Sequence, residues 1–157
     1  MNRKLRWPYW RKSVKISLTR IYDFERQKSW YDAAYKHAFF DSLIYYIFES
    51  LYDEVYEDGE KALGVSLYNR EEFDLINNWI SFFDDEFKAN QPDSYYHNHP
   101  LWPKLIDDAK HIVALMEENE KKYDYAADVK DYDRQQREER IKAIKELENK
   151  KSKNLKS

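Results

Sequence analysis

The sequence predicts an all-α protein: a three- to four-helix bundle with an extended basic N-terminal arm and a long charged C-terminal helix. Apolar residues recur every three or four positions over long stretches, as they do along one face of an α-helix. Residues that break helices are rare, since the 157 residues include two glycines and four prolines. From residue 104 onward there are none, so nothing in the sequence interrupts a helix there.

Residues 1–25 are predicted to form the extended arm. The first 28 residues hold nine Lys and Arg against two acidic residues, a net charge of +7. Pro8 favours an extended backbone. Over residues 13–22 the apolar side chains of Val14, Ile16 and Leu18 alternate with polar ones, which is typical of a short strand or of an arm lying across a helix face.

The core domain is predicted to span residues 26–128 and to begin with a long helix over 26–57. Five apolar residues at helical spacing form the stripe of this helix: Phe40, Ile44, Ile47, Leu51 and Val55. A loop over 60–68 follows it and contains Gly64.

A second helix is predicted over residues 70–89. Asn69 is placed to cap its N-terminus, and Glu72 is placed three residues later to bond back to the cap. Its apolar stripe consists of Phe73, Ile76, Ile80, Phe83 and Phe87, with Leu75, Trp79 and Phe82 widening it. Because this helix is apolar on two sides, we expect it to be central.

The last third of the chain is predicted to be helical. An irregular loop over 90–103 holds three of the four prolines, and Pro103 suits the first turn of the next helix. We expect helix to continue to about residue 150 with a break near Tyr123–Asp128. Residues 129–157 form the charged helix and a frayed tail.

Composition excludes several classes of function. The absence of cysteine rules out disulfides, thiolate zinc sites and cysteine nucleophiles. No glycine-rich phosphate loop or nucleophile elbow is present. No apolar run approaches the roughly 18 residues that a membrane span needs, and no apolar segment follows the basic N-terminus as in a signal peptide. We therefore expect a cytoplasmic, non-catalytic protein without catalytic residues, metal or cofactor, and without a membrane partner.

The arm is the first candidate binding site. Clustered Lys and Arg neutralise phosphates and exposed aromatic rings stack on bases, and the arm offers both. The candidate residues are Arg3, Lys4, Arg6, Trp7, Tyr9, Trp10, Arg11 and Lys12. Three occupants stay open: a nucleic acid, a protein partner, or the acidic middle of the same chain, residues 29–108, whose net charge is −12.

The C-terminal helix is the second candidate. Residues 129–150 contain three clustered aliphatic side chains, Ile141, Ile144 and Leu147, which form a narrow stripe. Such a stripe cannot hold a long helix against a core. We therefore predict that these residues contact a partner, either a second copy in a homo-oligomer or another protein.

The leading interpretation is an accessory or regulatory protein that docks on a protein or protein–nucleic acid assembly. Its small size, lack of cysteine and richness in Tyr, Asp and Lys resemble phage-encoded accessory proteins, which would place it in the host cytoplasm. One alternative is a metal-dependent enzyme that uses His97 and His99 with a carboxylate such as Asp93. Another is an inhibitor whose acidic clusters, at residues 53–60 and 84–86, mimic nucleic acid.

Overall fold

The computed structural model describes residues 4–23, 59–89, 91 and 93–155, and within these ranges it contains helices and no strand. The helices are α1 (Pro8–Tyr22), α4 (Gly59–Ala62), α5 (Arg70–Glu86), α6 (Asp93–His97), α7 (Trp102–Lys122) and α8 (Tyr125–Leu155). This confirms the all-α class. The predicted helix over 26–57 lies outside the described residues, so the number of helices in the bundle stays a prediction.

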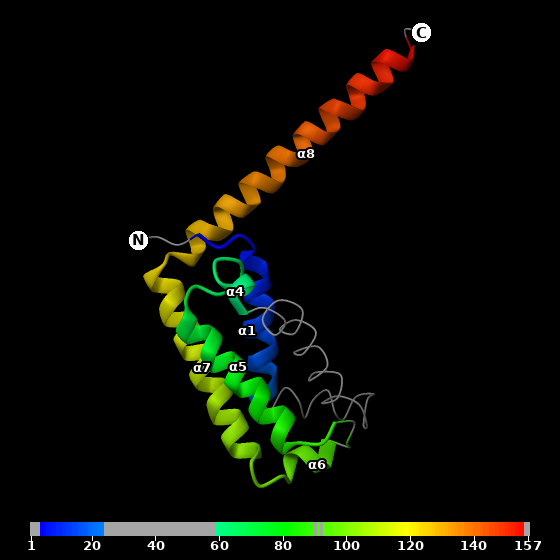
Figure 1. The fold of residues 1–157 in the computed structure, drawn as a ribbon. Helices are drawn as coiled ribbons and strands as arrows, with labels where there is room; N and C mark the ends of the chain where they lie inside the picture. Colours follow the sequence, from blue (N-terminus) through cyan, green and yellow to red (C-terminus); the bar gives the residue numbers. More distant parts are fainter. Residues whose placement is uncertain (1–3, 24–58, 90, 92, 156–157) are drawn as a thin grey trace.

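Among the described helices α7 is central, because both α1 and α5 pack against it. Helix α8 contacts α1 and α7 near its start and then runs away from the body as a rod (Figure 1). The predicted break falls between α7 and α8, where Asp124 has a φ of 56°. Aspartate tolerates this left-handed backbone better than most residues, so it can turn the chain without glycine.

The prediction that residues 13–22 form a short strand or an extended arm is wrong, because α1 contains this whole segment. Val14, Leu18 and Ile21 are buried at helical spacing, whereas Ile16 is 40% exposed. Pro8 occupies the first turn of α1 instead of extending an arm. Three alternating apolar residues fit a strand, but burial of one helical face against α7 decides the conformation.

Arg11 fixes α1 to the other elements of the body. Its side chain is fully buried, and its Nη1 donates to Glu72 Oε2 at 2.8 Å while its Nη2 lies 2.7 Å from Glu72 Oε1. It also donates to the backbone carbonyls of Met116 at 2.8 Å and Ser66 at 3.3 Å. The guanidinium carbon lies 4.6 Å from the centroid of the Tyr68 ring. One side chain of α1 therefore joins α5, α7 and the loop that precedes α5.

Glu120 closes the solvent side of this network. It accepts from Arg11 Nε at 3.3 Å and from Lys15 Nζ at 2.8 Å. Lys15 lies one helical turn after Arg11 on α1, so both cations reach the same carboxylate on α7. This second contact sets the position of α1 along α7.

The start of α5 confirms half of the predicted capping arrangement. Asn69 Oδ1 accepts from the backbone N–H of Glu72 at 3.0 Å. The Glu72 carboxylate does not accept the predicted reciprocal hydrogen bond from the backbone N–H of Asn69. Its Oε2 accepts from the backbone N–H of Tyr68 at 3.2 Å as well as from Arg11. The helix ends at Glu86, three residues before the predicted end at residue 89.

The apolar stripe of α5 forms much of the core. Ile76, Ile80 and Phe83 are buried, and Phe73 packs against the edge of the cluster. Phe83 stacks on Phe87 with ring centroids 5.1 Å apart. The indole N–H of Trp79 donates to the carbonyl of Leu105 at 3.0 Å, so the polar group of this buried ring is satisfied by α7. Leu75, which the sequence predicts to widen the stripe, is 38% exposed.

The core can be tested at Phe83. Phe83→Ala removes a buried ring from between α5 and α6, so we expect the free energy of unfolding to fall by about 3–5 kcal/mol. Leu75→Ala on the exposed side of the same helix is the control and should cost less than about 1 kcal/mol. Both values come from urea denaturation. Equal losses in the two variants would contradict this assignment of the faces of α5.

The Arg11 network makes a different prediction. Arg11→Ala leaves Glu72 buried without its partner, so we expect a loss of about 3–5 kcal/mol in the free energy of unfolding. Replacing both residues together, in Arg11→Met with Glu72→Met, removes both buried charges and should be less damaging than Arg11→Ala alone. A double variant less stable than the single variant would contradict this prediction, and would show that Glu72 stabilises the fold through a contact other than Arg11, such as the backbone N–H of Tyr68.

Candidate partner-binding surface at the base of α8

The first turn of α8 is tied to the body by two tyrosines. Tyr68 donates to the buried carboxylate of Asp128 at 2.6 Å, and Tyr125 donates to the carbonyl of Pro8 at 2.7 Å. Burial raises the pKa of Tyr125 to about 12. Burial, followed by the hydrogen bond to Asp128, also raises the pKa of Tyr68 well above its usual range. Both hydroxyls therefore stay protonated and keep donating at neutral pH.

The N-terminus of the chain braces the next turn of α8. Lys4 Nζ lies 2.9 Å from Asp131 Oδ2, and the Tyr9 hydroxyl donates to Asp133 Oδ1 at 2.8 Å. The hydrogen bond from Lys4 lowers the pKa of Asp131, so this carboxylate stays charged. The rings of Tyr9 and Tyr132 meet edge to face with centroids 5.5 Å apart. These contacts set the direction in which α8 leaves the body.

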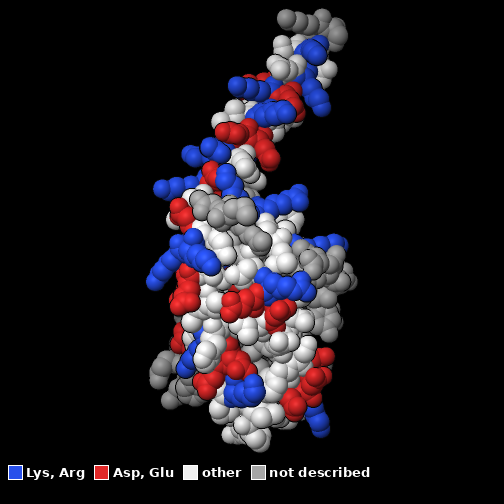
Figure 2. Space-filling view, turned by 60° about the vertical axis from the view of Figure 1, so that its left-hand side comes forward, with Lys and Arg blue, Asp and Glu red and all other residues white. Residues whose placement is uncertain are grey.

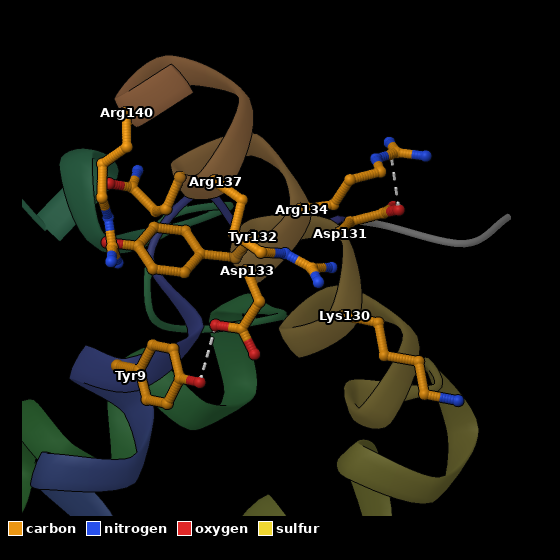
Figure 3. A pocket seen from close by; sticks show the side chains of 9 residues that line it. Tyr9, Lys130, Asp131, Tyr132, Asp133, Arg134, Arg137 and Arg140 are labelled. Atoms are coloured by element: carbon orange, nitrogen blue, oxygen red, sulfur yellow. Dashed lines mark hydrogen bonds and ion pairs between the residues drawn. The ribbon is translucent and has the colours of Figure 1, made fainter. Parts of the chain in front are cut away.

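A hollow of about 870 Å³ lies beside these contacts, between α1 and α8. Figure 3 shows Tyr9 of α1 reaching Asp133 of α8, and on another side of the helix Arg134 reaching Asp131. The remaining lining comes from α8: Lys130, Tyr132, Gln136, Arg137 and Arg140. Figure 2 shows Lys and Arg side chains gathered where α8 meets the body. The hollow is therefore predominantly cationic with an aromatic wall.

Most residues predicted for the arm lie near this junction. Five of them are exposed: Lys4, Arg6, Tyr9, Trp10 and Lys12. Trp7 is half-buried and packs on Trp10 with centroids 4.6 Å apart, and the Arg6 guanidinium lies 5.4 Å from the Trp7 ring. Arg3 lies outside the described residues.

Arg11 corrects the predicted set. The sequence groups it with the partner-binding cations, but it is completely buried against Glu72. A partner cannot reach it in this fold. Nothing in the sequence near Arg11 distinguishes it from the exposed cations beside it. Its burial follows from the packing of α1 against α7.

The aliphatic residues of the charged helix are exposed. Ile141, Ile144 and Leu147 are 53%, 55% and 60% exposed. Their contact with a partner stays a prediction.

Sequence reasoning missed the cations of α8 that line the hollow. Lys130, Arg134 and Arg137 follow one another at spacings of four and three residues, and Ile141 and Ile144 continue the same spacing. The cations and the apolar residues therefore lie on one stripe of α8. The spacing of four and three residues could have been found in the sequence. The cations were missed because the predicted stripe was defined by its aliphatic residues alone.

Among the side chains that the structure describes, His97 and His99 have partners other than a metal site. His99 Nδ1 accepts from the backbone N–H of Leu101 at 3.1 Å, and its ring lies 4.2 Å from Phe87. The ring of His97 packs edge to face on Trp102. Across the part of the chain that the structure describes, no three His, Asp or Glu side chains are grouped for a metal ion.

The acidic clusters are only partly visible. Asp84, Asp85 and Glu86 are exposed at the end of α5. The side chains of the other cluster, at 53–60, lie outside the described residues. None of the described helices is long and apolar enough to cross a membrane.

Residues 5–124 match the model of a protein family described as Domain of unknown function (DUF7945). The chain belongs to this family. The match ends at Asp124, the residue with positive φ that separates α7 from α8. The family domain therefore comprises the helical body, and α8 lies beyond it. No curated protein matches the chain, and no solved structure does.

Because Tyr125 attaches α8 to the body, we predict that the free energy of unfolding depends on pH in the alkaline range. Tyrosine in an unfolded chain has a pKa of about 10, whereas burial raises the pKa of Tyr125 to about 12. The stability that neutral Tyr125 contributes is complete below about pH 10 and is lost as the pH rises toward 12, because the unfolded chain ionises first. Between these pH values, we expect the free energy of unfolding to fall more steeply in the wild type than in Tyr125→Phe.

Urea denaturation at successive pH values measures this difference. At neutral pH, Tyr125→Phe should lose about 0.5–1.5 kcal/mol, because it lacks the hydrogen bond to the Pro8 carbonyl. Parallel pH profiles for the two proteins would show that Tyr125 is not held in its neutral form.

Proposed function

We propose that this protein is a non-catalytic docking factor that attaches to a protein or protein–nucleic acid assembly through α8. The observation that carries the proposal is the exposure of α8. Every residue from Arg137 to Leu155 is exposed. At about 1.5 Å per residue, this part of the helix extends roughly 28 Å. The family domain acts as the body, and α8 reaches the partner.

The exposed stripe defines the chemistry of the contact. Ile141, Ile144 and Leu147 together present aliphatic surface that water hydrates unfavourably, so a partner that covers it gains stability from its burial. The stripe is continued by Arg137 on one side and by Lys151 on the other. The matching surface is an apolar groove with carboxylates at its rim, as in other helix-in-groove complexes.

Charge favours a different protein over a second copy. If two α8 helices pair antiparallel about Ile144, Ile141 faces Leu147 of the second copy, which is favourable. The same pairing places Arg140 opposite Glu148, where opposite charges attract, but it places Arg137 opposite Lys151 at the ends of the stripe, where like charges repel. An acidic partner avoids this repulsion, so we assign the stripe to another protein.

Truncation tests the proposal. A chain ending at Arg140 loses residues that are all exposed in the described part of α8, so we expect its melting temperature to stay within about 2 °C of the wild type. The full chain should capture a stoichiometric partner from its native host, and the truncated chain should not. The measurements are thermal unfolding followed by circular dichroism and affinity capture with quantification of the bound protein.

A triple substitution keeps the helix length. The triple variant Ile141→Gln, Ile144→Gln, Leu147→Gln removes the apolar stripe, and α8 should stay helical because glutamine is a good helix former. We expect this variant to lose partner capture. Leu75→Gln, an exposed apolar residue on α5, is the matched control and should retain capture. Retention of the partner by both the truncated and the triple variant would refute a docking role for α8. Sedimentation of the pure protein as a dimer that the triple substitution dissociates would assign the stripe to a second copy.

A further inference from the structure

We propose that the hollow at the base of α8 binds single-stranded nucleic acid, with the arginines of α8 holding backbone phosphates and Tyr9 stacking on a base. This site uses residues other than the aliphatic stripe and extends the proposed function. It also differs from the binding site first predicted for the N-terminal arm, because its cations all come from α8.

The charge of the hollow suits a polyanion. Four cations line it, Lys130, Arg134, Arg137 and Arg140, against two carboxylates, Asp131 and Asp133, which gives a net charge of 4 − 2 = +2. The carboxylates already have partners within the protein. Asp131 lies 2.9 Å from Lys4 Nζ and 3.3 Å from Arg134 Nη2, and Asp133 accepts from the hydroxyl of Tyr9. They therefore oppose an incoming anion less than two free carboxylates would.

Two of the arginines are available to a ligand. Arg137 and Arg140 are exposed, and no ion pair joins either of them to another residue in the described ranges. Their planar guanidinium groups present paired N–H donors that match the oxygens of a phosphate. From Lys130 to Arg140 the helix rises about 15 Å. The cations are thus spread along a line, as a nucleic acid backbone requires.

The aromatic wall distinguishes nucleic acid from other anions. Tyr9 is 40% exposed, and its hydroxyl bond to Asp133 and its edge contact with Tyr132 hold the ring in place. A fixed, exposed ring offers a stacking surface at low entropic cost. An acidic peptide would use the cations and leave the ring without a role. A single strand also fits better than a duplex, because its bases are free to stack.

Binding is measured by fluorescence anisotropy with labelled oligothymidylate and oligouridylate of about 15 nucleotides. In the double variant Arg137→Gln with Arg140→Gln, we expect binding to weaken about tenfold at ~100 mM salt. The slope of log affinity against log salt should become shallower by about 1.4, because each phosphate that is no longer neutralised contributes roughly 0.7. The matched control is Lys142→Gln with Lys153→Gln. It removes the same charge from the opposite side of α8 and should change binding less than about twofold.

Tyr9 separates stacking from charge attraction. Tyr9→Ala should weaken binding roughly tenfold, whereas Tyr9→Phe, which keeps the ring, should stay within about threefold of the wild type. Circular dichroism confirms that each variant is folded. The Ile141, Ile144 and Leu147 triple variant should bind the oligonucleotides like the wild type, so this site and the docking stripe can fail independently.

Four outcomes would overturn the proposal. The first is an equal loss in the two double variants, which would show attraction to the overall charge of α8. The second is an affinity weaker than about 1 mM at 50 mM salt. The third is displacement of the oligonucleotide by polyglutamate as effectively as by unlabelled oligonucleotide, which would assign the hollow to an acidic protein. The fourth is stronger binding to phosphatidylserine vesicles than to the oligonucleotides, which would assign it to an anionic membrane.

Discussion

The buried contact between Arg11 and Glu72 is the constraint on which the rest of the structure depends. A guanidinium can be buried only where its charge is paired and its N–H groups find acceptors. Arg11 meets this requirement with Glu72 of α5, Glu120 of α7 and two backbone carbonyls. A shift of α1 along α7 by one turn would break all of these bonds at once. The ion pair therefore determines the position of α1, whatever its net contribution to stability.

The position of α1 in turn determines where α8 leaves the body. Pro8 lies one turn before Arg11, and its carbonyl accepts from Tyr125 at the start of α8. Tyr9, the next residue, bonds to Asp133 across a separation of 124 residues in the sequence. Tyr68 completes the connection, since its ring lies beside Arg11, stacks on Tyr123 and carries the hydroxyl that bonds to Asp128. The packing of the core and the direction of α8 are thus linked through a few tyrosines.

This arrangement separates the chain into two parts with different physical character. The body carries the family domain and buries aromatic residues that combine apolar surface with a hydrogen-bonding group, such as Trp79 and Tyr96. Helix α8 is charged and solvated beyond its first turns, and its single apolar stripe stays exposed. Between the two parts lies a cationic hollow with a fixed aromatic ring. A protein contact on α8 and a nucleic acid contact at its base would place both partners on the same side of one helix.

The sequence by itself determined the helical class, the start of α5 at Asn69 and the break between α7 and α8. These features are local: a capping residue, the period of apolar side chains, and the absence of glycine and proline act within a few residues of the backbone that they shape. The exposure of Ile141, Ile144 and Leu147 also followed from local pattern, because three aliphatic residues are too few to hold a long helix. Only the tertiary structure decided that residues 13–22 are helical, that Arg11 belongs to the core while Lys12 faces solvent, and that Tyr9 meets the cations of α8. Each of these outcomes depends on contacts between residues more than a hundred positions apart, and the energy of burying a side chain against a distant element cannot be read from its neighbours in the sequence.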